Sequence, residues 1–499
     1  MDRTPVNLYD FDKTIYKKDS SMAFYFFCIK KKPYLIFHLF FVAILYILNV
    51  FSFITIEKLK EHYFKIITFF DDKDQLIKEF WEKEKKNIQP WYLSQKASTD
   101  VICTASPEFL IAPIFEQINP SATIIGTQIT IEDKKVICKK NCKGEEKFNR
   151  ILQYFNDNEI KFDSAYTDSV SDLPMLDLAE NKYIVCADKV YKFSEQKPTF
   201  KTKIIYSIKL LRIKHWIKNL LIFLPLVFSH ELFSYKFFDL IVGVIAFCFV
   251  SSFVYVLNDL IDVKKDRLHS TKRMRPIASY MIKPKEAVIL GSLCLAAGGG
   301  ITLLYFNFDI LIISILLIYC VVNILYSTIL KKIPIIDVFI LSFCYVLRLF
   351  FGGAIVDISI SNWLYLTTIS ASLFMGVSKR RNELRSEKNS TRDVNRSYSY
   401  VFLDKNLYVF QALTLIFYSL WAIEMDPISA YSLTNILFLA TIPLVYFIMM
   451  RYSYQIEKNN NSGNPVEVLL KDKILMFSAI LFVVMIFIAI YFPIPINII

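Results

Sequence analysis

The sequence predicts two unlike parts: a Rossmann-like α/β domain at the N-terminal end, then an all-α polytopic membrane bundle of nine helices. With 499 residues, the chain is too long for one compact core. Its apolar fraction of 54% and its mean hydropathy of +0.39 exceed those of soluble proteins. Near residue 200 the composition changes from mixed charged and apolar residues to long apolar runs. We therefore expect domains over 1–195 and 205–499, joined by a linker at 196–204.

Nine apolar runs in the second part are each long enough to cross a bilayer core of about 30 Å. They are expected near 218–233, 237–258, 286–305, 309–327, 335–355, 361–378, 407–424, 433–451 and 474–492. If the first crossing starts in the cytoplasm, Lys and Arg gather in the inner loops, and the outer loops contain only Lys236. This bias explains the net charge of +12 without nucleic acid as a partner. We expect a multi-pass protein of the inner (cytoplasmic) membrane.

The first residues, MDRTPVNLYDFDKT, lack the basic and apolar regions of a secretory signal, so the N-terminal domain is expected in the cytoplasm. Cysteines are scattered, and the CxxxC formed by Cys138 and Cys142 has no second Cys or His pair at metal-binding spacing. Reduced thiols are therefore expected, with zinc or a disulfide as the alternative. A homo-oligomer stays open.

The segment VNLYDFDKT contains the first candidate site. A short apolar strand ends at Asp10, and Asp12 follows two residues later. Because the backbone turns at the end of a strand, both carboxylates can reach one centre. Such a pair suits phosphoryl transfer, in which one carboxylate attacks phosphorus and the other protonates the leaving oxygen. A solvated acidic turn is the alternative for this motif taken alone.

Three later segments supply partners for this pair. VICTAS is a second buried strand, and it carries the hydroxyls of Thr104 and Ser106. NCKGEEKFNR offers Lys147 at a helix start, where its ammonium can neutralise phosphate charge. SAYTDSVSDLPML supplies Asp168 and Asp172, the carboxylates that Mg²⁺ prefers.

These residues, in this order, resemble the haloacid-dehalogenase phosphatase superfamily, specifically its phosphoserine-phosphatase-like branch, over about residues 4–195. The resemblance implies a parallel sheet with a helical cap at about 16–95. It implies Asp10 as nucleophile, Asp12 as acid and base, Thr104 and Lys147 on phosphate, and Mg²⁺ near Asp10, Asp12, Asp168 and Asp172. P-type ATPase pumps share the nucleophile but carry DKTGT, whereas this chain has DFDKTIY. A catalytically dead relic is the alternative.

One uncharged run, residues 33–56, lies inside the expected cap. A single crossing there would place Asp10 and Thr104 on opposite sides of the membrane, so that no site could assemble. Cations flank the run on both sides, at Lys30, Lys31, Lys32, Lys58 and Lys60. We therefore expect one or two helices that lie along the inner leaflet or dip into it, with a break near Asn49. A cap helix buried inside the soluble domain is the alternative.

The second candidate site is the segment YVLNDLIDVKKDRLHSTKRMRPI. Asn258, Asp262 and Asp266 are spaced four residues apart, with Asp259 beside them, so a helix would align them at the cytoplasmic membrane boundary. Such a stripe suits Mg²⁺, which bridges diphosphate oxygens. The cations that can bind the remaining phosphate charge are Arg267, Lys272, Arg273 and Arg275. An ordinary solvated loop explains these cations but not the acidic stripe.

The pattern NDxxDxxxD resembles the first motif of the UbiA-type membrane prenyltransferase superfamily, which implies a nine-helix bundle. The expected second motif is a tyrosine–lysine pair followed by DxxxD. Tyr326, Lys331 and Asp337 match it, but position 341 is leucine, and Arg348 lies further along. One acidic motif among cations differs from the two-metal clamp that suits a prenyl diphosphate donor.

With RIKHWIKNLLIFLP and SLFMGVSKRRNELR, the second part resembles the decaprenyl-phosphate phosphoribosyltransferase subfamily. The resemblance implies phosphoribosyl pyrophosphate as donor and a polyprenyl phosphate as acceptor. One Mg²⁺ site and several cations fit a donor that carries a diphosphate and a separate 5-phosphate. The candidates for the 5-phosphate or the lipid phosphate are Lys218, Lys379, Arg380 and Arg381. Anchoring of the span end is the alternative role for the last three.

The two parts together predict a bifunctional membrane enzyme. The implied transfer leaves a lipid-linked ribose that still carries its 5-phosphate. Two crossings separate the linker from Asn258, so a phosphatase domain on the same face could remove that phosphate. An aromatic prenyltransferase is one alternative, but this class of enzyme would require the second acidic motif, which is missing here. A lipid or solute transporter with a regulatory domain is the other alternative. A transporter would require an internal repeat in which corresponding spans are interrupted by Gly or Pro.

Overall fold

The computed structural model describes residues 6–50, 54–132, 135–155, 162–186, 189–229, 231–269, 271–386, 397–424, 433–459, 468 and 472–492. The chain forms two compact units, one of Met1–Ile205 with Ala278–Met281, the other of Tyr206–Ile277 and Ile282–Ile499. Helix α9 (Phe200–Leu210) covers part of the expected linker and continues into the second unit.

A six-stranded sheet is the centre of the first unit. Its strands are β1 (Asn7–Tyr9), β2 (Val101–Pro107), β3 (Thr123–Thr127), β6 (Phe162–Thr167), β7 (Ala179–Cys186) and β8 (Lys189–Lys192), in the order β3-β2-β1-β6-β7-β8. All neighbours are parallel except β7 and β8. In the register, Leu8 of β1 lies opposite both Val101 and Ala165. The carboxyl ends of β1, β2 and β6 therefore meet at one edge, where α/β proteins place their sites.

Shorter elements complete this α/β unit, and they confirm the predicted fold class for the N-terminal part. They are α6 (Glu108–Ile118), the hairpin of β4 (Ile129–Glu132) and β5 (Lys135–Cys138), α7 (Glu145–Tyr154), η4 (Val170–Asp172) and α8 (Leu173–Leu176).

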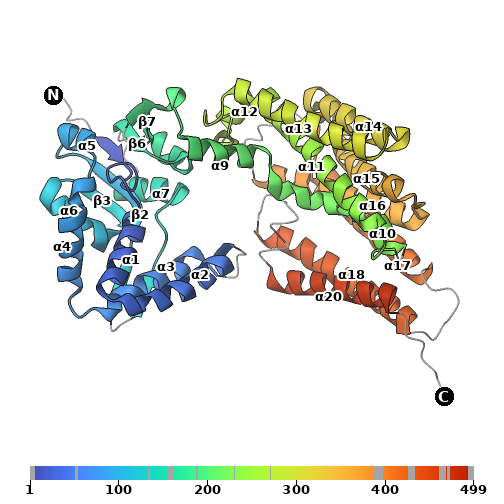
Figure 1. Cartoon of the computed structure of the whole chain (residues 1–499), viewed down its shortest axis with the longest axis horizontal. Helices are drawn as coiled ribbons and strands as arrows, with labels where there is room; N and C mark the ends of the chain where they lie inside the picture. Colours follow the sequence, from blue (N-terminus) through green and yellow to red (C-terminus); the bar gives the residue numbers. More distant parts are fainter. Residues whose placement is uncertain are drawn as a thin grey trace, which may run out of the picture. The chain divides into compact units, whose positions relative to one another are not determined.

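Five helices are inserted between β1 and β2 (Figure 1). They are α1 (Ser20–Lys31), α2 (Ile36–Val50), α3 (Ile56–Phe64), α4 (Lys73–Glu84) and α5 (Pro90–Gln95). Asp19 caps α1 and Asp72 caps α4, each by accepting a backbone N–H bond of the first turn. Trp81 of α4 is fully buried, and its indole donates to the carbonyl oxygen of Leu110 at 2.6 Å, which ties the insertion to α6.

The apolar run 33–56 contains two helices instead of one. Helix α2 ends at Val50, and α3 begins at Ile56, with residues 51–53 outside the described part. The side chain of Asn49 donates to the carbonyl oxygen of Ile54 at 2.9 Å across this break. At about 1.5 Å per residue, the 15 residues of α2 span less than the bilayer core.

The second unit is helical. It contains η6 (Ile213–Phe223), α10 (Leu224–Phe228), α11 (Lys236–Ile261), α12 (Val263–Leu268), η7 (Lys272–Met274), α13 (Pro284–Tyr305), α14 (Ile310–Thr328), α15 (Ile336–Val356), α16 (Asn362–Ser386), α17 (Tyr400–Glu424), α18 (Leu433–Asn459) and α20 (Lys473–Tyr491). Among the described residues, seven helices are long and apolar enough to cross a membrane: α11, α13, α14, α15, α17, α18 and α20. This confirms a helical, membrane-type second part.

Two of the nine expected spans are absent from these seven helices. The run at 218–233 forms the 3₁₀ segment η6 and the short α10, which restarts at Leu224 with Pro225 in its first turn. The run at 361–378 lies in α16, where serine and threonine lower the hydropathy. Nine crossings therefore stay a prediction.

A close backbone contact fixes η6 against α15. A Cβ atom added at Gly352 would lie 2.0 Å from the carbonyl oxygen of Ile222, so only glycine permits this approach. Ile222 lies near the end of η6, and Asn219, three residues before it, accepts a hydrogen bond from Arg348 of α15.

Candidate active sites

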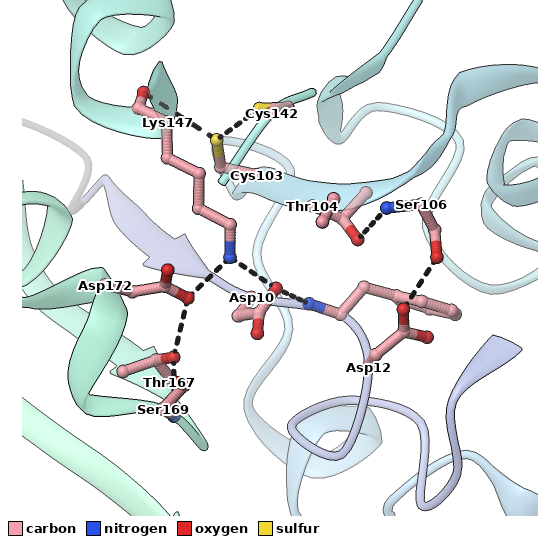
Figure 2. A network of polar contacts seen from close by, with 12 residues as sticks. Asp10, Asp12, Cys103, Thr104, Ser106, Cys142, Lys147, Thr167, Ser169 and Asp172 are labelled. Atoms are coloured by element: carbon pink, nitrogen blue, oxygen red, sulfur yellow. Dashed lines mark hydrogen bonds and ion pairs between the residues drawn. The ribbon is translucent and has the colours of Figure 1, made fainter. Parts of the chain in front are cut away.

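The nucleophile candidate Asp10 directly follows β1 and is held by Lys147 of α7 (Figure 2). The Lys147 Nζ lies 2.7 Å from Asp10 Oδ1 and 2.6 Å from Asp172 Oδ2. Thr167 also donates to Asp172 Oδ2, at 3.0 Å. Burial alone would lower the pKa of Lys147, but the two carboxylates raise it well above its ordinary value. The ammonium therefore stays charged beside Asp10.

The second carboxylate, Asp12, is oriented by two hydrogen bonds. Ser106 Oγ donates to one oxygen at 2.6 Å, and the backbone N–H of Ser20 donates to the other at 2.8 Å. Burial, together with the charge of Asp19, raises the pKa of Asp12 to about 6. A carboxyl group with this pKa can both donate and accept a proton near neutral pH.

Hydroxyl groups and a further carboxylate complete this edge of the sheet. Thr104 and Ser106 are buried in β2, where Thr104 Oγ1 accepts the backbone N–H of Ser106 at 3.1 Å. Asp168 follows β6. Burial, reinforced by the charge of Asp10, raises the pKa of Asp168 to about 8. The seven residues predicted for the phosphatase site thus all come from this edge or from α7 beside it.

The donor set at this edge fits Mg²⁺. Asp10, Asp168 and Asp172 bring three carboxylates near one ammonium, and burial, followed by the charge of Asp10, raises the pKa of Asp168. Within the described ranges, no three acidic, histidine or cysteine side chains form a metal cluster of their own. Mg²⁺ commonly takes only one or two carboxylates and completes its shell with water and substrate phosphate. Both oxygens of Asp12 accept hydrogen bonds, and Asp172 Oδ2 accepts two. Asp10 accepts its bonds from Lys147 and from the Phe11 backbone through Oδ1, so its Oδ2 and the carboxylate of Asp168 are proposed as the ligands.

Lys60 of α3 is a site residue that the sequence did not predict. Its Nζ donates to the carbonyl oxygen of Ala105 at 2.5 Å and to Asn141 Oδ1 at 2.6 Å. Burial lowers the pKa of Lys60 to about 8. Its partners among the described residues are neutral, so this cation adds net positive charge between Thr104 and Ser106. In the sequence, Lys60 is one of several lysines that flank the run 33–56. No neighbouring motif distinguishes it from the others as a site residue.

The CxxxC pair does not form a unit of its own. Cys142 Sγ lies 3.7 Å from Cys103 Sγ, and all cysteines of the chain are free thiols.

The second site begins with a buried carboxylate at the end of α11. Asp259 Oδ1 lies 2.5 Å from Arg212 Nη2 and 3.0 Å from Arg275 Nη1. Arg275 also contacts Asp266 Oδ2 at 2.7 Å, and Lys331 Nζ lies 2.5 Å from Asp262 Oδ1. Arg212 was not among the predicted residues, although it lies in the basic segment before the first expected span.

The acidic stripe keeps its predicted spacing although α11 ends at Ile261. The backbone N–H of Asp262 donates to the Asn258 carbonyl at 3.0 Å, and that of Asp266 donates to the Asp262 carbonyl at 2.8 Å. The amide and carboxylate side chains therefore recur at four-residue intervals, and their oxygens are ligands that Mg²⁺ accepts. Of the other predicted cations, Arg267 lies in α12, and Lys272 and Arg273 lie in η7.

A second polar cluster joins three predicted residues from separate helices. The buried Arg380 of α16 contacts Asp337 Oδ2 at 2.5 Å and the hydroxyl of Tyr326 at 3.2 Å. Tyr398 donates to the other oxygen of Asp337 at 2.6 Å, and Glu383 lies 2.7 Å from Arg380. Acidic partners thus neutralise Arg380.

Arg381 belongs to a different environment from its neighbour. It pairs with Asp404 of α17 at 2.7 Å and with Glu457 of α18. Successive residues of an α-helix point about 100° apart, so Arg380 and Arg381 cannot face one centre. The structure does not bring Arg381 to the other predicted residues, and its contacts tie α16 to α17 and α18.

Arg348 and Lys218 form a cationic cluster in which no described carboxylate takes part. The buried Arg348 donates to Asn219 Oδ1 at 2.8 Å and to the hydroxyl of Tyr319 at 3.1 Å. The Arg348 guanidinium lies 5.6 Å from the centre of the Tyr345 ring, and Lys218 Nζ lies 5.9 Å from it. Two cations with neutral surroundings suit an anionic ligand.

Several predicted cations act on one centre near His215, which precedes the first expected span. Burial lowers the pKa of His215 to about 4, and the charges of Lys218, Arg212, Lys379 and Arg275 add to this effect. Lys218 lies in η6, Arg212 directly precedes η6, Lys379 lies in α16, and Arg275 follows η7. Arg212 and Arg275 also contact Asp259, so their positive charge lies beside the acidic stripe.

Two protein families match separate parts of the chain. Residues 8–177 match the haloacid dehalogenase-like hydrolase family, and residues 222–469 match the UbiA prenyltransferase family. The chain joins a haloacid dehalogenase-like hydrolase domain to a UbiA prenyltransferase domain. It is therefore an enzyme with transferase and hydrolase parts.

Several curated relatives share one name. The decaprenyl-phosphate phosphoribosyltransferase of Mycolicibacterium smegmatis is 29% identical over 327 residues, which are 61% of this chain and 99% of the relative. The protein of the same name from Corynebacterium glutamicum is 28% identical, over 57% of this chain and 86% of its own length. A UbiA homologue from Archaeoglobus fulgidus, solved with GPP and Mg²⁺, aligns with 57% of this chain and 99% of its own, at 19% identity and a TM-score of 0.43.

Proposed function

We propose that the UbiA domain transfers 5-phosphoribose from phosphoribosyl pyrophosphate to a polyprenyl phosphate, and that the hydrolase domain then removes the 5-phosphate. The observation that carries the proposal is the pairing of two sites in one chain. Relatives named decaprenyl-phosphate phosphoribosyltransferase align with 61% of the chain. The same chain holds Asp10, Asp12 and Lys147 in an arrangement suited to phosphomonoester hydrolysis.

In the transfer step, an oxygen of the lipid phosphate attacks the anomeric carbon of the donor. The bond from that carbon to the diphosphate breaks, and pyrophosphate leaves with the electron pair. Asn258, Asp262 and Asp266 would hold Mg²⁺, whose charge would offset that of the diphosphate. Arg275 and Lys331 lie against this stripe, where they can bind the remaining diphosphate oxygens. Asp259 holds Arg275 in place from its buried position.

The two other phosphate groups of the substrates need separate cations. Lys218 and Arg348 suit the lipid phosphate, because no carboxylate among the described residues neutralises them. The 5-phosphate of the donor is assigned to Lys379 and to the cations of α12 and η7, namely Arg267, Lys272 and Arg273. Arg380 is instead a positioning residue, which orients Tyr326 and Asp337.

In the hydrolysis step, the Asp10 carboxylate attacks the phosphorus of the 5-phosphate. The bond from phosphorus to the ribose oxygen breaks, and protonated Asp12 gives its proton to that oxygen. Water then attacks the aspartyl-phosphate, Asp12 accepts the proton, and inorganic phosphate leaves. Thr104 and Lys147 bind the phosphate oxygens during both steps. Mg²⁺, held by Asp10 and Asp168, would offset the charge of the phosphate.

The proposal is tested with the purified full-length chain, labelled phosphoribosyl pyrophosphate and decaprenyl phosphate, with the lipid products separated by mass. The wild type should form a lipid-linked ribose without the 5-phosphate. Asp10→Asn should accumulate the 5-phosphorylated lipid, because only the nucleophile is lost. Asp262→Ala should form no ribosylated lipid and still hydrolyse a soluble phosphomonoester. Asp239→Ala is the matched control, since it removes a carboxylate from the other end of α11.

Two outcomes would contradict the assignments. If Asp262→Ala still transferred ribose, the assignment of the acidic stripe to the transfer site would be wrong. If Asp10→Asn still formed the dephosphorylated lipid, the proposed role of the hydrolase domain in this reaction would be wrong. A prenyl diphosphate with an aromatic acid should give no product, and turnover of that pair would favour aromatic prenylation.

A further inference from the structure

Helix α2 of the hydrolase domain has an apolar face that the described residues of its own unit leave exposed. Phe37 is 75% exposed and Phe40 is 65% exposed, and Phe41 and Ile44 are also exposed. These positions are spaced i, i+3, i+4 and i+7, so they form one continuous face. The opposite face packs into the core of the unit through Leu39, Val42 and Leu45. The helix is therefore apolar on both sides, and protein covers one of them.

The few polar groups of α2 are turned away from the exposed face or lie at the ends of the helix. His38 hydrogen-bonds through Nδ1 to the hydroxyl of Tyr25 at 2.6 Å, and Asn49 donates to Ile54. Tyr34 and Tyr46 are exposed near the two ends. Tyrosine is enriched at the level of the lipid headgroups, so these rings suit the borders of an apolar face that enters a bilayer. The face itself offers no hydrogen-bonding group by which a protein partner would be recognised.

Charge and length both favour a bilayer as the covering surface. Helix α1, which precedes the run, ends with Lys30 and Lys31, and Lys58 lies in the first turn of α3. Cations at both ends of an apolar helix complement anionic lipid headgroups. The helix is too short to cross the membrane, and the seven candidate spans of the second unit anchor the whole chain there. The hydrolase domain is therefore covalently joined to helices that suit a bilayer.

We propose that α2 lies in the membrane interface, with Phe37, Phe40, Phe41 and Ile44 inserted among the lipid acyl chains. The hydrolase domain then has a second attachment to the bilayer besides its covalent connection to the membrane helices. Such an attachment holds the cap helices at the lipid surface. This inference rests on the exposed face, the flanking cations and the length of the helix, and it is independent of which phosphate the domain hydrolyses.

Site-specific photo-crosslinking of the full-length protein tests the proposal directly. The photoreactive residue p-benzoylphenylalanine replaces Phe40 in one variant and the exposed Tyr154 of α7 in a matched control. Each protein is irradiated in nanodiscs of phosphatidylethanolamine and phosphatidylglycerol, and its peptides are analysed by mass. The expected result is a lipid adduct at position 40 and none at position 154. An adduct to a peptide of this chain or of a second copy would overturn the proposal, as would equal lipid labelling at both positions or no lipid adduct.

A second experiment, in which negative charge is introduced on the exposed face, distinguishes lipid insertion from mere proximity to lipid. Phe37→Glu and Phe41→Glu are combined with the photoreactive residue at position 40, and hydrolysis of a soluble phosphomonoester reports on the fold. Because both side chains are exposed, this hydrolysis should be unchanged. The yield of lipid adduct should fall at least several-fold, since carboxylates do not enter the acyl region. An unchanged yield would overturn the proposal, and neither readout depends on the lipid substrate.

Discussion

Asp12 is the residue whose role can be measured most sharply. Its carboxyl group accepts hydrogen bonds from Ser106 Oγ and from the Ser20 backbone N–H. In asparagine the amide oxygen can accept from the Ser20 N–H, and the amide NH₂ can donate to Ser106 Oγ, which then acts as the acceptor. Asp12→Asn therefore removes the transferable proton with little change in shape. Loss of a general acid lowers a rate by ~10²–10⁴-fold, equal to about 2.7–5.4 kcal/mol of transition-state stabilisation.

The size of the effect should depend on the leaving group. An alkyl phosphate releases a poor leaving group that needs the proton, so its kcat/KM should fall by ~10²–10⁴-fold. p-Nitrophenyl phosphate releases a stable phenolate, so its kcat/KM should change by less than about tenfold. The variant should then show a burst of one phenolate per active site, because Asp12 is also the base for hydrolysis of the aspartyl-phosphate. Stopped-flow absorbance measures this burst, and unchanged ribosyl transfer shows that the protein is intact.

The pH profile gives an independent check. A pKa of about 6 means that Asp12 is protonated below that pH and ionised above it. For the wild type and an alkyl phosphate, kcat/KM should therefore fall as pH rises above about 6, and Asp12→Asn should lose this limb. Equal losses for the alkyl and the nitrophenyl substrate, or a pH profile that the substitution leaves in place, would refute proton donation by Asp12.

Three further predictions concern Lys60, Arg348 and Gly352. Lys60→Met should lower kcat/KM for phosphomonoesters by ~10–100-fold, because a hydrogen bond to a charged group contributes about 1.5–3 kcal/mol. Lys60→Arg should recover part of the loss. The kcat/KM of the wild type should decline above about pH 8, where Lys60 loses its proton. Arg348→Met should raise the KM for polyprenyl phosphate at least tenfold and leave soluble phosphatase activity unchanged; an unaltered KM would exclude it from the lipid phosphate. Gly352→Ala should lower the thermal unfolding temperature of the membrane unit, at a cost of ~1–3 kcal/mol or more, whereas Gly299→Ala, with open space around it, should not.

The phosphatase residues could be predicted from the sequence because local patterns determine their positions. Asp10 and Asp168 each follow a buried strand, and Thr104 lies within one, so parallel pairing is enough to bring them to one edge. Lys60 could not be found in this way. It reaches the site from the inserted helices, and its position depends on how α3 packs, which no short motif records.

The membrane half shows the corresponding limits of sequence patterns. The spacing of Asn258, Asp262 and Asp266 follows from helical periodicity alone, and the backbone retains it. The consecutive cations Arg380 and Arg381 looked like one group, but helix geometry directs them to different partners. Hydropathy predicts a span at 218–233. An average over composition cannot reveal that this run begins in the 3₁₀ segment η6, or that a new helix starts at Leu224 with Pro225 in its first turn.

The three-residue strand β1 makes formation of the hydrolase site an all-or-none event. Leu8 pairs with Val101 on one side and with Ala165 on the other, so the pairing of the strand that precedes Asp10 is completed only after most of its domain has been synthesised. Contacts so distant along the chain form late and slowly in folding, because long loops must close first. All the strands of this sheet precede Lys236, where the first candidate span begins. During translation, the complete sheet therefore emerges from the ribosome before the first of the seven membrane helices.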